Sequence, residues 1–186
     1  EKIKSYETTT KHDVKALEYF LKDKLSNTPA SQLINYIHLG LTSEDVNNLA
    51  YGILTKDFIT CEYLTVLDNL ISILKNLAIE YKHEVMVGRT HGQPAVPTTF
   101  GKELAIYTSR LVKLSLKVKK FKPEGKLNGA VGNFNALNYV YPKIDWPKKA
   151  VKFVESLGLL NNPLTTQRES GDSLAELFDH LRRLNL

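Results

Sequence analysis

The sequence contains few of the residues on which several common kinds of site depend. Its 186 residues include one cysteine, one methionine and one tryptophan. The lone Cys61 excludes an intrachain disulfide and favours a reducing compartment. No run of about 18 apolar residues could span a membrane, and no signal-peptide pattern opens the sequence. We therefore expect a cytoplasmic protein with no membrane partner.

Motifs for metal and nucleotide-phosphate binding are also missing. There is no HExxH and no cysteine cluster, and the histidines lack the spacing of metal ligands. No P-loop occurs, and Gly125, Gly129 and Gly132 have the wrong spacing for a dinucleotide motif. We expect neither a metal nor a cofactor.

The overall composition is that of a soluble globular protein. Hydrophobic residues make up 42% and charged residues 24%. The net charge of +5 is densest over residues 117–122, a cluster that indicates the solvated end of a helix, with nucleic-acid binding as the alternative. We expect no nucleic-acid partner, although a modest positive field would help to attract an anionic substrate.

Helical periodicity dominates the sequence and predicts an all-α protein. The strongest segment follows the capping pattern at residues 42–45 and runs without a proline to about Lys82, with Cys61 expected as a small core residue. Such a helix is roughly 60 Å long and indicates a long-helix bundle whose apolar stripes need an oligomer to cover them. Further helices are predicted over residues 12–26, 29–39, 98–121, 145–157 and from about 170 onward, and strand signal is confined to short pieces such as 84–87.

The stretch from Arg89 to Glu103 is the most informative part of the sequence. It predicts His91 on a rigid loop that opens directly into a long helix, with Pro94 and Pro97 stiffening the path. An imidazole held in this way can donate or accept a proton near neutral pH. The alternative is a hydrogen-bonded structural histidine.

Other polar clusters also fall at predicted helix ends. Helix N-termini favour phosphate and carboxylate groups, so these clusters suit an anionic small molecule. Taken singly, each has a structural alternative: a helix cap, a satisfied core histidine, or a bond from a loop to the backbone. The clusters are Lys11-His12-Asp13, His38 with Thr42-Ser43, and Thr165-Thr166-Gln167.

Together these segments resemble the adenylosuccinate lyase family, within the fumarase/aspartase superfamily, and its longer bacterial-type branch in particular. They follow the family's order and cover nearly the whole sequence. The matching pieces are TTKHDV (9–14), IHLGLTSEDVNN (37–48), GRTHGQPA (88–95), GKLNGAVGNFNA (125–136) and NPLTTQ (162–167).

The resemblance implies a β-elimination in purine nucleotide synthesis. Adenylosuccinate would give AMP and fumarate, and the ribotide SAICAR would give AICAR and fumarate. It further implies a homotetramer whose active sites are shared between subunits. Residues 1–40 would end an N-terminal domain, and residues 41–186 would form part of the central helical bundle.

The family's site residues carry over by motif position. His91 would be the general acid, and Lys11, His12 and Asp13 would lie against the nucleotide. Thr42 and Ser43 would hold a succinyl carboxylate. The remaining implied substrate-binding residues are Gln167, Lys126, Asn128 and, as a weaker candidate, His38.

Two departures from the family pattern bear on these roles. Lys11 stands where close relatives are expected to have asparagine. The mobile signature loop, GSSxMPxKxN, which carries the serine expected to act as base, does not occur among these 186 residues, so the stretch is expected to be an inactive fragment of a longer enzyme. The alternatives are a non-catalytic helical scaffold and a related lyase with another amine leaving group.

Overall fold

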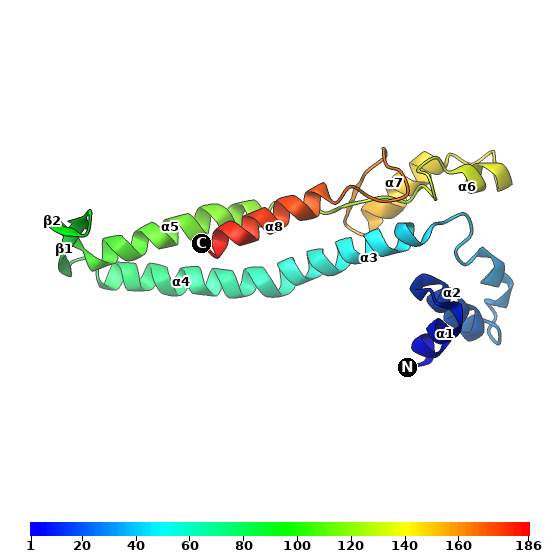
Figure 1. Ribbon diagram of the computed structural model, residues 1–186, viewed down its shortest axis with the longest axis horizontal. Helices are drawn as coiled ribbons and strands as arrows, with labels where there is room; N and C mark the ends of the chain where they lie inside the picture. The colour runs from blue at the N-terminus through cyan, green and yellow to red at the C-terminus, as the bar shows by residue number, and fades with distance from the viewer. The chain divides into compact units, whose positions relative to one another are not determined.

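The computed structural model describes all 186 residues, which divide into two compact units. The first unit comprises residues 1–53 and 123–171, and the second comprises residues 54–122 and 172–186. Figure 1 labels the α-helices and the strands β1 and β2. In chain order they are α1 (Lys2–Thr10), α2 (Asp13–Leu25), η1 (Ser31–Tyr36), α3 (Ser43–Asp57), η2 (Phe58–Tyr63), α4 (Leu64–Glu80), β1 (Val85–Thr90), β2 (Gln93–Thr99), α5 (Phe100–Val118), β3 (Glu124–Gly125), α6 (Asn135–Val140), α7 (Trp146–Ser156), β4 (Leu160–Asn161) and α8 (Asp172–Leu184).

The core of the first unit forms where α3 meets the short strands β3 and β4, which pair in parallel. Leu49, Val154 and Leu159 are its buried residues. Helix α7 contributes Val154, and it begins as the sequence predicts, with the Asp145 carboxylate accepting a hydrogen bond from the Lys148 amide at 3.0 Å. This core fixes the start of α3 against the chain that follows β3.

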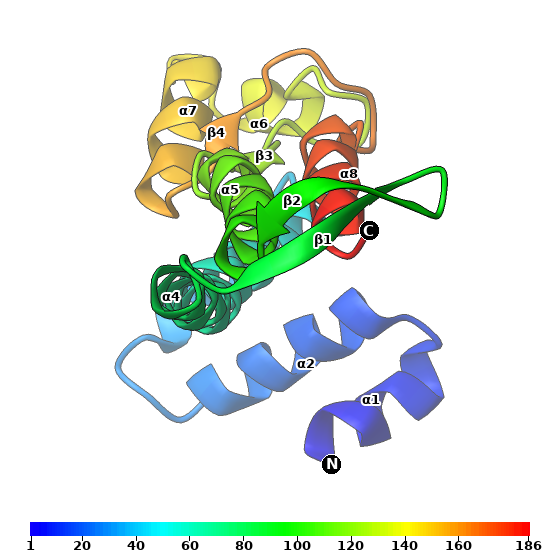
Figure 2. The same ribbon diagram turned by 90° about the vertical axis from the view of Figure 1, so that its left-hand side faces the viewer.

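In the second unit, α4 and α5 lie side by side, and α8 packs on α5 (Figures 1 and 2). Ile59 of η2, Val118 of α5 and Leu177 of α8 form the buried core of this unit. Close approach of α5 to α4 depends on Gly101, because a Cβ there would overlap the carbonyl oxygen of Ala78 in α4. None of the helices in either unit is both long and apolar enough to cross a bilayer.

The segment around His91 differs from the predicted loop. β1 and β2 form an antiparallel two-stranded sheet, seen face-on in Figure 2, and His91 lies in the turn between them. The prolines in β2 are tolerated because the sheet has only two strands. Proline has no N–H group to donate, and the outer edge of β2 has no further strand that would need one. The strand β2 therefore separates His91 from α5, whose N-cap is Thr99, with its hydroxyl 3.1 Å from the Lys102 amide.

Most helices predicted from periodicity are confirmed, and some details are wrong. Helical structure is continuous through α3, η2 and α4, but η2 is a π-helical segment that periodicity did not predict. Cys61 is exposed, so its assignment to a core is wrong. The helix expected over 29–39 is a short 3₁₀ segment, η1. The division of the complete protein into domains at residue 40 stays a prediction.

Candidate substrate-binding site

The first turn of α3 is organised by a buried carboxylate. Asp45 is fully buried, and its Oδ2 accepts a hydrogen bond from the Thr42 amide at 2.9 Å. An acid three residues after a hydroxyl residue is the spacing of a capping box, in which the acid satisfies the amide of the capping residue. Asp45 therefore fixes the backbone at Thr42 and Ser43, which begin the helix.

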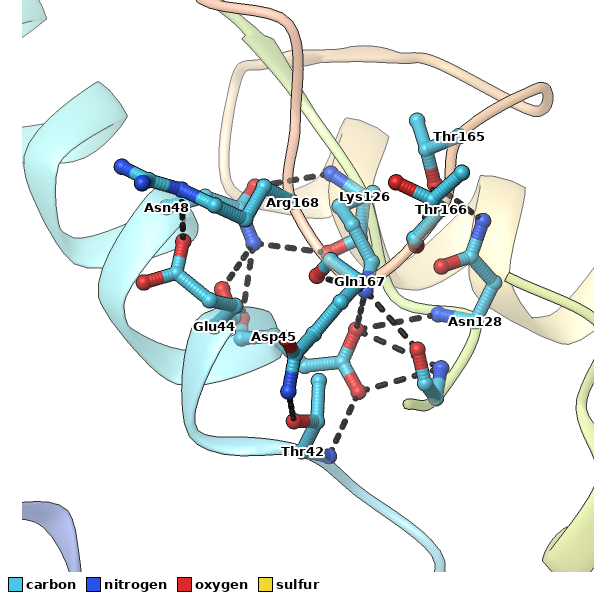
Figure 3. A network of polar contacts seen from close by, with 11 residues as sticks. Thr42, Glu44, Asp45, Asn48, Lys126, Asn128, Thr165, Thr166, Gln167 and Arg168 are labelled. Atoms are coloured by element: carbon cyan, nitrogen blue, oxygen red, sulfur yellow. Dashed lines mark hydrogen bonds and ion pairs between the residues drawn. The ribbon is translucent and has the colours of Figure 1, made fainter. Parts of the chain in front are cut away.

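Asp45 also forms an ion pair with Lys126, which lies on the glycine-rich segment after β3 (Figure 3). Asp45 Oδ1 and Lys126 Nζ are 2.9 Å apart, and both side chains have no solvent exposure. The carboxylate accepts further hydrogen bonds from the amides of Asn128 and Gly129, each at 3.1 Å. A buried ion pair is tolerated when its remaining hydrogen-bonding capacity is satisfied, as it is here.

The Lys126 ammonium uses all three of its donors within the protein. Besides Asp45 it contacts the carbonyl oxygens of Gly129 at 2.9 Å and Gln167 at 2.7 Å. An ammonium has three N–H groups and no acceptor, so none remains for a ligand in this arrangement. The predicted contact of the Lys126 side chain with substrate stays a prediction.

Asn48, one turn further along α3, binds the backbone of the same segment. Its Oδ1 accepts from the Lys126 amide at 2.8 Å, and its Nδ2 donates to the Lys126 carbonyl at 3.1 Å. The neighbouring Gly125 allows this approach, since a Cβ there would lie 2.7 Å from the Leu49 side chain. The helix and the glycine-rich segment are therefore joined by side-chain and backbone contacts together.

The segment 165–168 completes the network (Figure 3). Gln167 Nε2 lies 3.5 Å from the Thr42 hydroxyl, and Asn128 Nδ2 donates to the Thr165 hydroxyl at 2.8 Å. Arg168 lies 3.8 Å from Glu44 on the exposed side. A hollow of about 430 Å³ adjoins this segment, lined by Gly132, Asn133, Pro163, Leu164, Thr165, Thr166, Arg168 and Ser170.

His12 lies at the N-cap of α2 and reaches the start of α3. Its Nε2 is 3.2 Å from the Ser43 hydroxyl, while its Nδ1 is 3.4 Å from the Lys15 amide and 3.3 Å from Asp13 Oδ1. A neutral ring that accepts from Lys15 at Nδ1 carries its proton on Nε2 and donates it to Ser43. One imidazole thus connects the predicted nucleotide-binding and carboxylate-binding residues.

Three further predicted residues lie near these positions, and two of them have unusual backbone angles. Lys11 has a φ of 52° and ends α1, with its side chain exposed. His38 has a φ of 64° and is half-buried just before Gly40. Asp13 is exposed, and its Oδ1 accepts a hydrogen bond from the Val14 amide at 2.7 Å. The roles of all three residues stay predictions.

His91 belongs to the second unit and lies at the tip of the β-hairpin. It has a φ of 53° and is followed by Gly92 with a φ of 74°. Two successive positive φ values are the signature of a type I′ turn, whose twist matches that of the flanking strands. The turn presents the His91 ring to solvent. Its role as general acid stays a prediction.

The structure brings together five of the residues predicted from sequence: Thr42, Ser43, Lys126, Asn128 and Gln167, with His12 at the edge. Sequence reasoning missed Asp45 and Asn48, which join these residues. The three-residue spacing between Thr42 and Asp45 was the available signal, because it matches a capping box. Nothing arranges three or more His, Cys, Asp or Glu side chains to hold a metal ion.

Comparison with known proteins gives relatives across the full sequence. The chain is 44% identical over 185 residues to adenylosuccinate lyase of Escherichia coli (strain K12), covering 99% of this chain and 41% of that protein. It is 43% identical over 186 residues to adenylosuccinate lyase of Vibrio cholerae, with 99% and 41% covered. The chain thus spans about two fifths of the length of these curated relatives.

Solved structures share the fold at lower identity. A fumarate lyase from Mesorhizobium sp. BNC1 superposes with a TM-score of 0.79 at 20% identity, over 98% of this chain and 41% of that chain. The 3-carboxy-cis,cis-muconate lactonizing enzyme from Pseudomonas putida gives 0.76 at 23% identity, over 97% and 40%. These likenesses confirm the predicted long-helix fold. The family model described as "Lyase" matches residues 1–186, and the chain therefore belongs to that lyase family.

Proposed function

We propose that the complete protein is an adenylosuccinate lyase, which releases fumarate from adenylosuccinate to give AMP and from SAICAR to give AICAR. The observation that carries this proposal is the convergence of Thr42, Ser43 and Gln167 at the start of α3, with His12 alongside. Identity of 44% to a curated adenylosuccinate lyase, spread over 99% of the chain, supports the choice of substrate.

The start of α3 would bind a carboxylate of the succinyl group. The positive end of the helix dipole favours an anion there, and the hydroxyls of Thr42 and Ser43 can donate to its oxygens. The Gln167 amide, 3.5 Å from the Thr42 hydroxyl, is a further donor at the same point. Hydrogen bonds to a charged ligand contribute about 1.5–3 kcal/mol each, so three such donors would supply a substantial part of the affinity.

His12 would lie at the nucleotide end of the site. Its side chain is 48% exposed, and a ring N–H group can donate a hydrogen bond to a phosphate oxygen. The neighbouring Lys11 and Asp13 would contact the nucleotide, with Lys11 adding positive charge. In this arrangement the bond between His12 and Ser43 at 3.2 Å sets the spacing between the nucleotide and the carboxylate.

The reaction would break the bond between the purine-linked nitrogen and the succinyl carbon. A base removes a proton from the adjacent succinyl carbon, the C–N pair leaves with the nitrogen, and an acid returns a proton to that nitrogen. His91 would be the acid. Fumarate and AMP account for all atoms of adenylosuccinate, and the reaction needs neither water nor an oxidant. The serine expected as base would come from outside these 186 residues.

We also infer a homotetramer with shared active sites, working in the cytoplasm. Large apolar side chains are exposed along the helices of the second unit, among them Val66 at 70%, Ile73 at 58% and Tyr107 at 58%. Exposed apolar surface of this kind marks an interface. Light scattering tests the assembly: a monomer at micromolar concentration would contradict it.

The experiment that tests the proposal is a fumarate-release assay on the full-length gene product with adenylosuccinate, SAICAR and argininosuccinate. We expect turnover of the first two and none of the third. Turnover of argininosuccinate alone would assign the protein to a related lyase, and no turnover of any would contradict an elimination function.

A matched pair of histidine variants tests the role of His91. His91→Ala should lower kcat by at least about a hundredfold, the usual contribution of general acid catalysis. His83→Ala is the control, since His83 is an exposed residue just before β1 and has no assigned role. If the two variants had the same kcat, His91 would not be the general acid.

A further inference from the structure

A buried ion pair joins the segments that carry the residues proposed to bind the succinyl carboxylate. Asp45 binds the backbone of Thr42 at 2.9 Å, and Lys126 binds the backbone of Gln167 at 2.7 Å. The two charged side chains meet at 2.9 Å with no solvent exposure. Thr42 and Gln167 are 125 positions apart in the chain, and their side chains lie 3.5 Å apart. The ion pair links their two segments, together with the hydrogen bond from Asn128 to Thr165.

We propose that Asp45 and Lys126 are positioning residues that set the geometry of the carboxylate site without touching the substrate. This inference rests on the proposed function. Both groups are unavailable to a ligand, because every donor of the ammonium is used and the carboxylate accepts from Thr42, Asn128 and Gly129. Their effect on binding therefore passes through the backbone segments that they hold.

A buried ion pair adds little net stability, because the cost of removing both charges from water offsets their attraction. Replacement of such a pair by apolar residues of similar volume is often neutral or stabilising, whereas removal of one partner leaves an unpaired buried charge. What the pair provides here is direction: one carboxylate orients three amides, and one ammonium orients two carbonyl groups. Apolar packing is non-directional and could not fix these groups at defined angles.

The consequence is a selective effect on ligands. Loss of the pair would let the segment at Gln167 move away from Thr42, and a carboxylate bound there would lose well-placed donors. The nucleotide contacts proposed for Lys11, His12 and Asp13 come from the start of α2. This segment contacts the Ser43 hydroxyl through His12 but makes no bond to Asp45 or Lys126. We therefore expect fumarate binding to weaken far more than AMP binding.

The test uses the full-length gene product and separate titrations with fumarate and with AMP. In the double variant Asp45→Asn/Lys126→Met, which leaves no unpaired charge, we expect fumarate affinity to fall by at least about tenfold, as for loss of one hydrogen bond to a charged group. AMP affinity should stay within about twofold. The control double variant, Asp68→Asn/Lys119→Met, removes an exposed ion pair of the second unit and should change neither affinity.

The outcomes separate this inference from the proposed function. If the unmodified protein binds neither AMP nor fumarate, the proposed function fails, and the inference fails with it. If it binds both and the double variant loses both in proportion, or loses neither, only the positioning role is overturned. A purely structural pair would lower the melting temperature and leave the ratio of the two affinities unchanged.

A second variant keeps the test decisive if the double variant does not fold. Lys126→Arg retains both charges, but a planar guanidinium cannot reproduce the three directions of an ammonium at Asp45, Gly129 and Gln167. We expect a folded protein with the same selective loss of fumarate affinity. Unchanged fumarate affinity in a folded Lys126→Arg protein would contradict the positioning role.

Discussion

Two glycines with nearly the same backbone angle provide a matched test of the geometry beside the candidate site. Gly132 has a φ of 81° and Gly171 a φ of 79°. They differ in their surroundings. A Cβ at Gly132 would overlap the Thr165 carbonyl oxygen, whereas a Cβ at Gly171 would meet no atom within 4 Å. Alanine at each position therefore separates backbone strain from steric overlap.

The expected magnitudes follow from these differences. A left-handed conformation at a residue with a Cβ costs roughly 1–2 kcal/mol, and this applies to both variants. Overlap with packed atoms adds about 1–3 kcal/mol, and at Gly132 the atom that must move belongs to the backbone. We expect Gly171→Ala to lower the free energy of unfolding by about 1–2 kcal/mol and Gly132→Ala by about 2–5 kcal/mol.

Urea denaturation at matched protein concentration measures both values. The Gly132→Ala variant should also bind fumarate more weakly, because displacement of Thr165 carries Gln167 with it, while Gly171→Ala should not. Equal losses of stability in the two variants, with equal fumarate affinity, would refute the reasoning. They would show that the backbone at Gly132 is not packed closely against the carbonyl group of Thr165.

Three further predictions concern other parts of the chain. Burial opposes ionisation of Glu18, but hydrogen bonds from Lys15 and Lys22 outweigh it and hold its pKa below the ordinary value of 4.5. Glu18 therefore stabilises the fold above that pH and loses its contribution as the pH falls through the lowered pKa. The difference in free energy of unfolding between wild type and Glu18→Gln should therefore become smaller in acid. A difference that does not change with pH would contradict this. Leu177→Ala should lower the free energy of unfolding by about 2–5 kcal/mol, because Leu177 is 1% exposed in the core of the second unit, and a loss below 1 kcal/mol in urea denaturation would argue against that packing. Ser43→Ala should raise KM for adenylosuccinate about tenfold in steady-state assays, since it removes one hydroxyl from the carboxylate site, and an unchanged KM would remove Ser43 from that site.

Local chemistry made much of the helical structure predictable. The sequence pattern of Asp145 and Pro147 marked the start of α7, and the structure has Asp145 at the N-cap with proline in the first turn. Thr99 caps α5 close to the predicted start. The long prolineless segment after Thr42 is helical through Glu80. In each case the determinant lies within a few residues of the element it controls.

The missed features depend on partners distant in sequence. Asp45 has an adequate local explanation as an acid in a first turn, so nothing in its neighbourhood indicated Lys126 as a partner. The hairpin was hidden for a different reason: Pro94 and Pro97 favour a loop on sequence alone, and only pairing with β1 makes them strand residues. The positive φ of His91, which makes the tight turn possible, is also uncommon outside glycine.

The most direct test of the account is to identify by NMR the products that the full-length protein forms from adenylosuccinate. An elimination lyase forms AMP and fumarate in equal amounts from the first turnover, and incorporates no oxygen from water into either product. Formation of AMP with malate, or of IMP with aspartate, would contradict the proposed elimination, and so would binding of adenylosuccinate with no reaction.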